Sequence, residues 1–313
     1  MTPPDGSKPH QPIQTLVDEY IDWCVNRRGL RPLTVRMYKS TLRNFSIFLA
    51  DTQLQSLQPE DIEAFARRPI RGGAAPAAPT ARREQVTVSK FMDWCNARKQ
   101  LGCFGHLTCV APKVRAGVPK PIVDDVWRHL WMSPTVCPDD RLWLGLGYFC
   151  GFRRYEMVTI RPEEVIRSSQ VMQFERKGGG FYTLDYLAMT ASVAERLPWL
   201  SEGWEAWITL LEGQAADRAT EEHLSVYATA DDPFLDGNRL SKRLGRVLSN
   251  AGLENTAFTL HQLRHSCATN LFRCGWQAEV VQKAMSHTSF EVTKGYMDVA
   301  GHMRAKLTER GAL

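Results

Sequence analysis

Apolar residues recur at three- and four-residue spacings through the first third of the chain, which is the period of a helix with one buried face. The spacing predicts helices over residues 13–27 and 33–50. The segment QPEDIEAFAR, with acidic residues in its first turn, predicts a short third helix, and a fourth is expected to begin at Thr80 after the loop GGAAPAAP. Residues 13–100 are therefore expected to form a four-helix domain.

The pattern changes after a glycine- and proline-rich stretch at residues 101–121, which is expected to be an interdomain linker. Two strand-like runs, 171–176 and 181–187, flank a glycine-rich turn and predict a β-hairpin. Elsewhere, helical periods are expected over residues 124–132, 139–150, 191–212, 239–251, 260–274 and 277–286. The chain is thus expected to be mainly α, with an α+β second domain over residues 122–298 that holds a small sheet.

The two ends of the chain differ from these domains. Residues 1–12 are rich in proline and are expected to be a disordered tail. Residues 299–313 place Val299, Met303 and Leu307 at four-residue steps, so this tail contains an amphipathic stretch. Such a stretch suits docking on a neighbouring protomer, and packing against its own domain is the alternative.

Composition restricts the class of protein. The 313 residues are 43% hydrophobic, which is enough for about two globular domains. Because no run of ~18 apolar residues and no signal-peptide pattern occurs, the chain is expected to be soluble, cytoplasmic and without membrane partners. Its eight cysteines form no C-x-x-C pair, which favours reduced core thiols over zinc ligands or disulfides.

The net charge of +5 is unevenly distributed. Residues 1–120 hold 18 lysines and arginines against 10 aspartates and glutamates, a net charge of +8, whereas the remainder carries a net charge of −3. A basic module attached to a nearly neutral domain is typical of a protein that grips DNA, since phosphate neutralisation supplies most non-specific affinity. A merely solvated basic surface is the alternative.

The segment HQLRH at residues 261–265 is the first candidate for chemistry. On a helix, His261, Arg264 and His265 share one face that could hold a metal or an anion. The zinc-protease motif H-E-x-x-H requires a glutamate as general base where this chain has Gln262. An arginine would also repel the metal ion, whereas a guanidinium beside imidazoles suits a phosphate. The segment therefore predicts a phosphate site.

Three further segments of the second domain carry polar groups suited to the same chemistry. GFRRYEM places Arg153 and Glu156 three residues apart, so that the carboxylate can hold the guanidinium. The tip of the predicted hairpin offers Lys177. MSHTSFEVTKGYMDV offers His287 and, nine residues later, Tyr296. No P-loop, Rossmann glycine pattern or acidic metal cluster accompanies them in the sequence.

In this order and spacing, the motifs resemble those of the tyrosine recombinase family, the phage-integrase-like site-specific recombinases. Members of that family carry an arginine in a G-L-R-x-x-E context, a hairpin lysine, H-x-x-R-H, a G-H pair and a tyrosine nine residues after that histidine. This chain has GFR for G-L-R and MSH for L-G-H, so Ser286 stands where a glycine normally allows a close turn. The resemblance extends over residues 13–300, weakly in the N-terminal helices and strongly in the motifs.

The resemblance implies a site-specific DNA recombinase of the simple two-domain type, with the tyrosine recombinase catalytic fold behind an N-terminal core-binding DNA domain. Such an enzyme clamps double-stranded DNA at specific recombination sites, and a homotetramer on two sites exchanges strands through a four-way junction. Accessory DNA-bending proteins are left open as partners, and the nucleoid is the expected location. No metal or ATP cofactor is expected, because a phosphotyrosyl link conserves the bond energy for rejoining.

The resemblance also assigns roles at the scissile phosphate. Tyr296 is implied to be the nucleophile that forms a 3′-phosphotyrosyl intermediate. Arg153 and Arg264 are implied to bind the non-bridging phosphate oxygens bidentately. Glu156 is expected to hold the guanidinium of Arg153 in place.

The proton-transfer residues follow from the same resemblance. Lys177 is implied to be the general acid for the leaving 5′ oxygen, with its neighbour Arg176 as the alternative. His261 is expected to assist proton transfer at the tyrosine, and His287 to hydrogen-bond the phosphate. His265 is expected to satisfy a buried hydrogen bond rather than touch DNA.

Two other functions share parts of this sequence pattern. A type IB topoisomerase uses the same chemistry but rejoins the same strand, and the two-domain layout favours recombination over it. A DNA-binding regulator of recombinase descent would be expected to lack Tyr296 or one of the two arginines, and this chain retains them.

Overall fold

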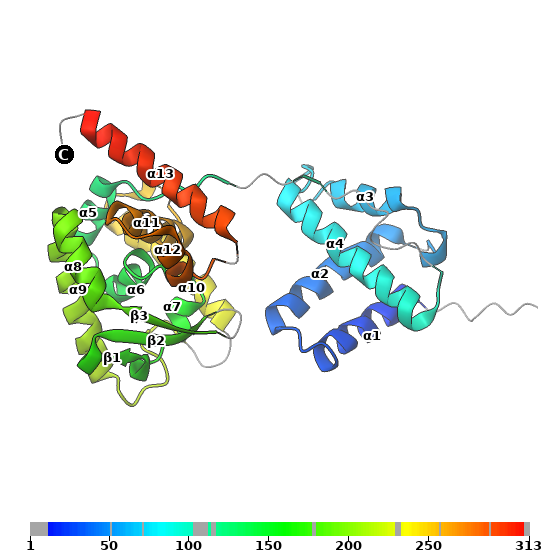
Figure 1. Cartoon of the computed structure of the whole chain (residues 1–313). Helices are drawn as coiled ribbons and strands as arrows, with labels where there is room; N and C mark the ends of the chain where they lie inside the picture. Colours follow the sequence, from blue (N-terminus) through cyan, green and yellow to red (C-terminus); the bar gives the residue numbers. More distant parts are fainter. Residues whose placement is uncertain are drawn as a thin grey trace, which may run out of the picture. The chain divides into compact units, whose positions relative to one another are not determined.

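The chain divides into two compact units, Met1–Ala116 and Gly117–Leu313 (Figure 1). Each unit has a hydrophobic core of its own. The computed structural model describes residues 12–50, 52–70, 72–102, 112–113, 117–176, 180–228, 233–256, 258–287 and 289–309.

Unit 1 is built from helices that pack in pairs. They are, in chain order, α1 (Ile13–Asn26), α2 (Pro32–Leu49), α3 (Pro59–Arg67) and α4 (Ala78–Trp94). Proline lies in the first turn of α2, α3 and α4, where its fixed φ suits a helix start and its missing N–H would have no partner. Helix α1 packs on α2, and α3 packs on α4. The four helices expected in the first third of the chain are thus confirmed.

Aromatic rings fill the core of unit 1. The buried ring of Tyr20 in α1 lies with its centroid 6.2 Å from that of Tyr38 in α2 and 5.5 Å from that of Phe91 in α4. Phe45 of α2 packs edge-on against Phe65 of α3 at 5.1 Å. These contacts bury one face of α2 and of α4 and leave the opposite faces to solvent.

Unit 2 is also mainly helical, and a small sheet lies at one side of its helices (Figure 1). The helices are α5 (Asp124–Met132), α6 (Pro138–Tyr148), α7 (Glu156–Thr159), α8 (Tyr186–Arg196), α9 (Pro198–Asp217), α10 (Pro233–Asn250), α11 (Leu260–Arg273), α12 (Ala278–Met285) and α13 (Phe290–Glu309). Helix α6 is buried almost throughout, and α11 packs against both α6 and α13. The helix that carries HQLRH therefore packs against both the helix that precedes GFRRYEM and the helix that carries Tyr296.

The sheet contains the expected hairpin and one further short strand. Strands β1 (Val165–Ile166), β2 (Val171–Arg176) and β3 (Gly180–Asp185) pair antiparallel in that order. The second run, expected over 181–187, ends at Asp185 because Tyr186 begins α8 with its ring buried and its hydroxyl donating to Glu212 at 2.8 Å.

The single helix expected over residues 191–212 is two helices in the structure. Helix α8 ends at Arg196, and Pro198 opens α9 in its first turn. A proline cannot donate the backbone bond that would continue α8, so the chain starts a new helix there. The mainly α fold with an α+β second unit is confirmed.

Helix α13 is continuous from Phe290 to Glu309, so residues 299–309 extend the helix that carries Tyr296. Thr293, Tyr296 and Ala300 are buried along one face of this helix, which packs on α11. The expected boundary between the second domain and the tail, at residues 298 and 299, therefore falls within one regular helix. The buried face of this helix continues to Ala300.

Six of the eight cysteines lie in the described part of the chain. Free thiols are found at Cys24, Cys95, Cys137, Cys150, Cys267 and Cys274, whereas Cys103 and Cys109 lie outside the described residues. Across the described ranges, the helices are too short or too polar to cross a membrane.

Candidate active site

Helix α11 places the HQLRH segment. The helix begins after Thr259, whose backbone N–H donates to the Gln262 side-chain oxygen at 2.9 Å in a capping box. Gln262 therefore stabilises the helix start, where a zinc protease would need a glutamate. His261 is exposed, and its ring centroid lies 4.6 Å from that of His265 one turn later.

Arg264 is a buried link between three segments. Its guanidinium is 2% exposed and donates from one nitrogen to the Gly151 carbonyl and from another to the Met285 carbonyl. Gly151 has φ +67°, and a Cβ there would lie 2.7 Å from the Met285 side chain. Its φ and the lack of space both require a glycine at this position. The GFR motif therefore begins with the residue whose carbonyl accepts a hydrogen bond from Arg264.

Arg153 and Glu156 form the expected pair. The Arg153 backbone N–H donates to one Glu156 oxygen at 2.7 Å, and its guanidinium donates to the other at 2.9 Å. Glu156 is 2% exposed and is the first residue of α7, whereas Arg153 is 28% exposed. The carboxylate thus fixes both the backbone and the side chain of Arg153.

Both arginines meet the turn that follows α12. Arg264 binds the Met285 carbonyl, and Arg153 donates to the Ser286 carbonyl at 3.1 Å. Ser286 has φ +49° and ψ +52°, the left-handed conformation that favours glycine. Its hydroxyl is buried without a hydrogen-bond partner among the described residues. The MSH variant therefore keeps the backbone turn that a glycine would make, at some cost in strain.

His287 is held by its backbone and its ring. Its N–H donates to the Gln282 carbonyl at 3.0 Å, and its Nδ1 lies 3.0 Å from the Thr293 hydroxyl. The ring stacks on that of Tyr296, with centroids 5.3 Å apart and an interplanar angle of 8°. His287 and Tyr296, nine residues apart in the sequence, are thus in contact.

Tyr296 is 3% exposed, and its hydroxyl lies 2.6 Å from Nδ1 of His265. The sequence indicated a buried hydrogen bond for His265 and did not indicate its partner. The spacing of H-x-x-R-H gives no signal for this contact, because it forms only when α13 packs against α11.

Burial and nearby cations set the protonation states. Burial raises the pKa of Tyr296, and the positive charge of Arg264 partly opposes this. Burial, then His261 and Arg264, lower the pKa of His265 to about 4. Partial burial and the charges of Arg264 and Arg153 also lower the pKa of His261, although solvent around this exposed ring screens them. At neutral pH the phenol is therefore protonated and His265 is a neutral acceptor.

The structure thus brings together Arg153, Glu156, His261, Arg264, His287 and Tyr296 and adds His265. Lys177 lies between β2 and β3, outside the described residues, and the side chain of Arg176 is also outside them. Their proposed role in proton transfer therefore stays a prediction.

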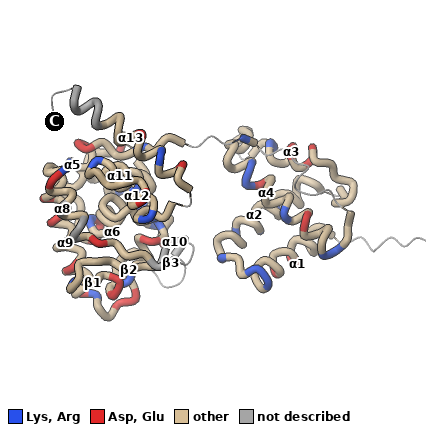
Figure 2. The backbone as a smooth tube through the Cα atoms, in the orientation of Figure 1, with Lys and Arg blue, Asp and Glu red and all other residues tan. Residues whose placement is uncertain are grey.

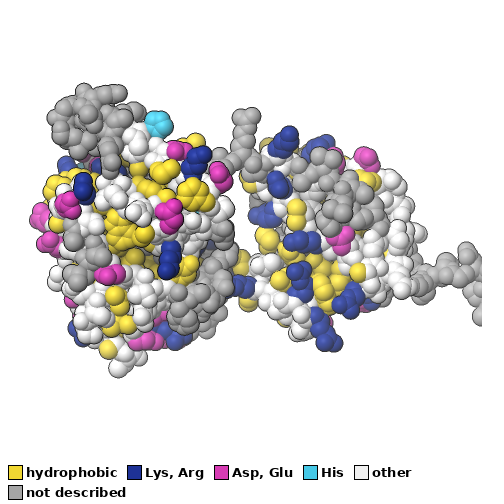
Figure 3. Space-filling model, viewed as in Figure 1, with side chains coloured by type: hydrophobic (Ala, Val, Ile, Leu, Met, Phe, Trp, Pro, Cys, Tyr) yellow, Lys and Arg dark blue, Asp and Glu magenta, His cyan; other side chains and the backbone are white. Residues whose placement is uncertain are grey.

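Basic side chains form a separate feature on unit 1. The exposed ones on α2 are Arg36, Lys39 and Arg43, and α2 contains no acidic residue. On α4, which packs against α2, Arg82, Arg83 and Lys90 are exposed. Figure 3 shows lysine and arginine side chains gathered on one face of this unit with few acidic ones among them, and Figure 2 marks the basic positions along its backbone.

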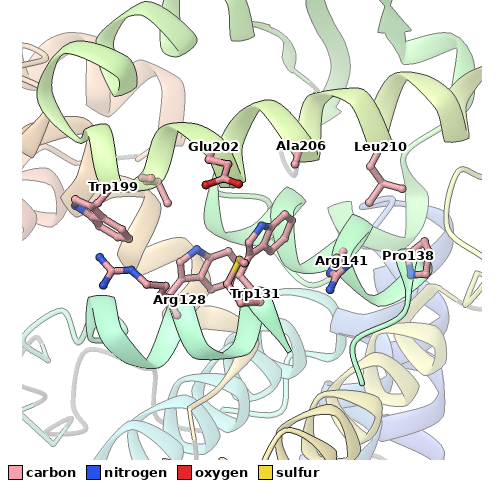
Figure 4. Close-up of a pocket in the computed structure, with 12 residues that line it drawn as sticks. Arg128, Trp131, Pro138, Arg141, Trp199, Glu202, Ala206 and Leu210 are labelled. Carbon is pink, nitrogen blue, oxygen red and sulfur yellow. The ribbon is translucent and has the colours of Figure 1, made fainter. Parts of the chain in front are cut away.

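A groove in unit 2 is distinct from the candidate active site. It has a volume of about 520 Å³ and lies between α5 and α9, with Trp131 and Trp199 on its walls (Figure 4). The Arg128 guanidinium lies 5.4 Å from the Trp199 ring centroid at its edge. None of the candidate catalytic residues lines this groove.

Comparison with known proteins covers both units. Residues 134–302 match the model described as the phage integrase family, and residues 17–99 match the phage integrase N-terminal SAM-like domain. A relative named tyrosine recombinase XerC, from Rhodospirillum centenum (strain ATCC 51521 / SW), is 26% identical over 292 residues, which are 88% of this chain and 80% of the relative.

Solved structures share the fold. A lambda integrase dimer bound to a COC′ core site has a TM-score of 0.65 at 18% identity, covering 91% of this chain and 94% of that one. A lambda integrase tetramer bound to a Holliday junction has a TM-score of 0.65 at 18% identity, covering 94% of this chain and 80% of that one.

Proposed function

The chain belongs to the phage integrase family, and we propose on that premise that it is a site-specific DNA recombinase acting through a 3′-phosphotyrosyl intermediate. The observation that carries the proposal is the meeting of four distant segments at one turn. Arg153 and Arg264 both bind backbone oxygens of residues 285–286, and the ring of His287 in that turn stacks on Tyr296. Two guanidiniums and a phenol in this arrangement suit phosphoryl transfer without a metal.

The chemistry follows from these positions. Arg153 and Arg264 would bind the non-bridging oxygens of the scissile phosphate and stabilise the charge that builds up on them. The Tyr296 oxygen would attack the phosphorus, and the 5′ oxygen would leave. Glu156, by holding Arg153, would orient one of the two guanidiniums before DNA arrives.

Three residues would serve the phosphate and the leaving group. We assign Lys177 as the general acid for the 5′ oxygen, with Arg176 as the alternative. His287 has Nδ1 held by Thr293, so Nε2 is the nitrogen that would hydrogen-bond the phosphate. His261 is exposed beside Arg264 on α11, where it would reach the same phosphate and assist proton transfer.

DNA would be gripped by basic faces on both units. On unit 1 the faces of α2 and α4 present Arg36, Lys39 and Arg82 among others, which agrees with the net charge of +8 in residues 1–120. On unit 2, α10 exposes Lys242 and Arg246 and packs against α7, which begins three residues after Arg153.

Assembly into a homotetramer on two DNA sites is proposed by analogy with the lambda integrase tetramer on a Holliday junction. The end of α13 is the segment proposed to dock on a neighbouring protomer, and accessory DNA-bending proteins are left open. Because Ala300 is buried in the core, we propose that the exchanged part of α13 follows it.

Covalent capture tests the proposed function. The full chain is incubated with a random-sequence duplex library nicked near the middle, and DNA that resists denaturing extraction is sequenced. We expect a recurring sequence from the wild-type chain and nothing from Tyr296→Phe. Equal covalent recovery with Tyr296→Phe would contradict the assignment of the nucleophile, and absence of any covalent DNA would contradict the proposed chemistry.

Recombination is distinguished from relaxation by the products. Two copies of the captured sequence on one plasmid should yield recombinant product and four-way junctions. A chain that relaxes supercoiled plasmid without these sites and never gives junctions would be a topoisomerase.

A further inference from the structure

The hydroxyl of Tyr296 already has a hydrogen-bond partner before DNA is bound. His265 Nδ1 lies 2.6 Å from it, within the range of a strong O–H to nitrogen bond. Each partner also contacts a further ring. The ring centroid of His261 lies 4.6 Å from that of His265, and the ring of His287 stacks on Tyr296.

We propose that His265 is the general base of strand cleavage and accepts the proton of the Tyr296 hydroxyl. The inference rests on the proposed function and adds a catalytic residue to it. In the cleavage step the Oη–H bond breaks and the proton moves to Nδ1 of His265. The Oη–phosphorus bond forms as the bond from phosphorus to the 5′ oxygen breaks, and that oxygen takes a proton from the general acid, Lys177 or its alternative Arg176. In rejoining, each proton returns along the same path.

The surrounding groups favour His265 over His261 in this role. His261 is exposed and contacts the His265 ring, whereas the contact to the hydroxyl is made by His265. Burial raises the pKa of Tyr296, and the positive charges of Arg264 and Arg153 oppose part of this rise. Burial, His261 and Arg264 disfavour a protonated His265, so its ring is a neutral acceptor before cleavage.

The pH dependence of cleavage separates a base from a structural residue. His265 is neutral throughout pH 6–9, since its pKa is lowered to about 4, so the wild-type rate should not vary with its protonation. Without a base, only the phenolate can attack, and its fraction rises about tenfold per pH unit below the raised pKa of Tyr296. A structural role would lower the rate equally at every pH.

The variant for this test is His265→Asn, because an asparagine oxygen occupies nearly the position of Nδ1 and accepts a hydrogen bond but no proton. Single-turnover cleavage is measured on the captured duplex with the scissile 5′ oxygen replaced by sulfur, so that the leaving group needs no general acid. We expect a loss of ~10² or more at pH 7 and a rate that rises steeply with pH. His129→Asn, an exposed histidine on α5, should retain the wild-type rate and profile.

A second measurement needs no DNA. Nitrogen-15 NMR of histidine-labelled full-length protein, assigned by loss of a signal in His265→Asn, follows the titration of His265. Removing the hydroxyl in Tyr296→Phe should raise the His265 pKa, because a donated hydrogen bond stabilises the neutral ring.

Each result decides the inference. A steep profile in His265→Asn together with a Tyr296-dependent pKa supports it. The inference is overturned if the pH–rate profile of His265→Asn runs parallel to that of the wild type, or if the His265 pKa is near 6.5 and does not change in Tyr296→Phe. In both of those cases the proposed function stands as long as Tyr296→Phe fails to capture DNA; covalent capture by Tyr296→Phe would overturn both.

Discussion

Arg264→Lys should remove most cleavage activity and leave unit 2 folded. The guanidinium serves the Gly151 and Met285 carbonyls from two different nitrogens, and it would also bind the scissile phosphate. A lysine carries its three donors on a single nitrogen, so it cannot span two carbonyls and a phosphate at once. The change preserves the charge and removes the fork geometry.

The magnitudes of the two effects differ. Losing hydrogen bonds from a charged group to buried carbonyls costs about 1–3 kcal/mol, which lowers the melting temperature by roughly 2–4 °C per kcal/mol in a domain of this size. Losing one donor that stabilises transition-state charge lowers cleavage by ~10² or more. Activity should therefore fall far more than stability at a temperature where the variant is folded.

Single-turnover covalent cleavage and thermal unfolding measure the two quantities. The matched control is Arg273→Lys on the same helix, where both terminal nitrogens of a 9% exposed arginine donate to Asp124 at 2.9 Å. This control should lose similar stability and keep its cleavage rate. Near-normal cleavage by Arg264→Lys would show that Arg264 does not bind the scissile phosphate. Equal rate losses in Arg264→Lys and Arg273→Lys would show that the loss of cleavage comes from impaired folding.

Three further predictions concern the nucleophile, the basic face of unit 1 and the end of α13. Tyr296→Phe should bind the captured duplex as tightly as the wild type and form no covalent complex on a denaturing gel; weakened binding would show that the hydroxyl does more than attack. The triple change Arg36→Ala, Lys39→Ala and Arg43→Ala should reduce the slope of log affinity against log salt by about three, and an unchanged slope would place the DNA elsewhere. Truncation after Met303 should spare single-site cleavage and abolish junctions in the two-site plasmid assay, whereas normal recombination by the truncated chain would mean that the tail packs on its own unit.

Local sequence signals located most helices of unit 2. The helical period predicted α5, which begins at Asp124 as expected, and the capping box of Thr259 and Gln262 lies at the start of α11. These features depend on neighbours within one turn, so the sequence contains them. The two-residue strand β1 is defined only by pairing with β2, and the start of α8 depends on the burial of Tyr186. Neither has a local signal.

The active site divides in the same way. The pairing of Arg153 with Glu156 was predictable, because the two residues are three apart and the contact closes a single turn. Both arginines contact the Met285–Ser286 turn across long stretches of sequence. Arg153 and Ser286 are 133 residues apart, and Arg264 and Met285 are 21 residues apart. The family motif implied that these residues act together, but the geometry depends on how α6, α11 and α12 pack.

His265 is the clearest case of a role that spacing cannot reveal. Residues 261 and 265 have the same side-chain chemistry and lie one helical turn apart, so their spacing ranks neither above the other as a proton acceptor, and the preference for His261 came from the family resemblance. The choice is made by α13, which packs on α11 at a height that puts the Tyr296 hydroxyl against the second histidine. Thr293 and Ala300, on either side of the tyrosine, are buried on the same face of α13. A substitution that enlarges Ala300 would therefore be expected to shift the hydroxyl relative to His265 and lower cleavage without touching any group that reacts.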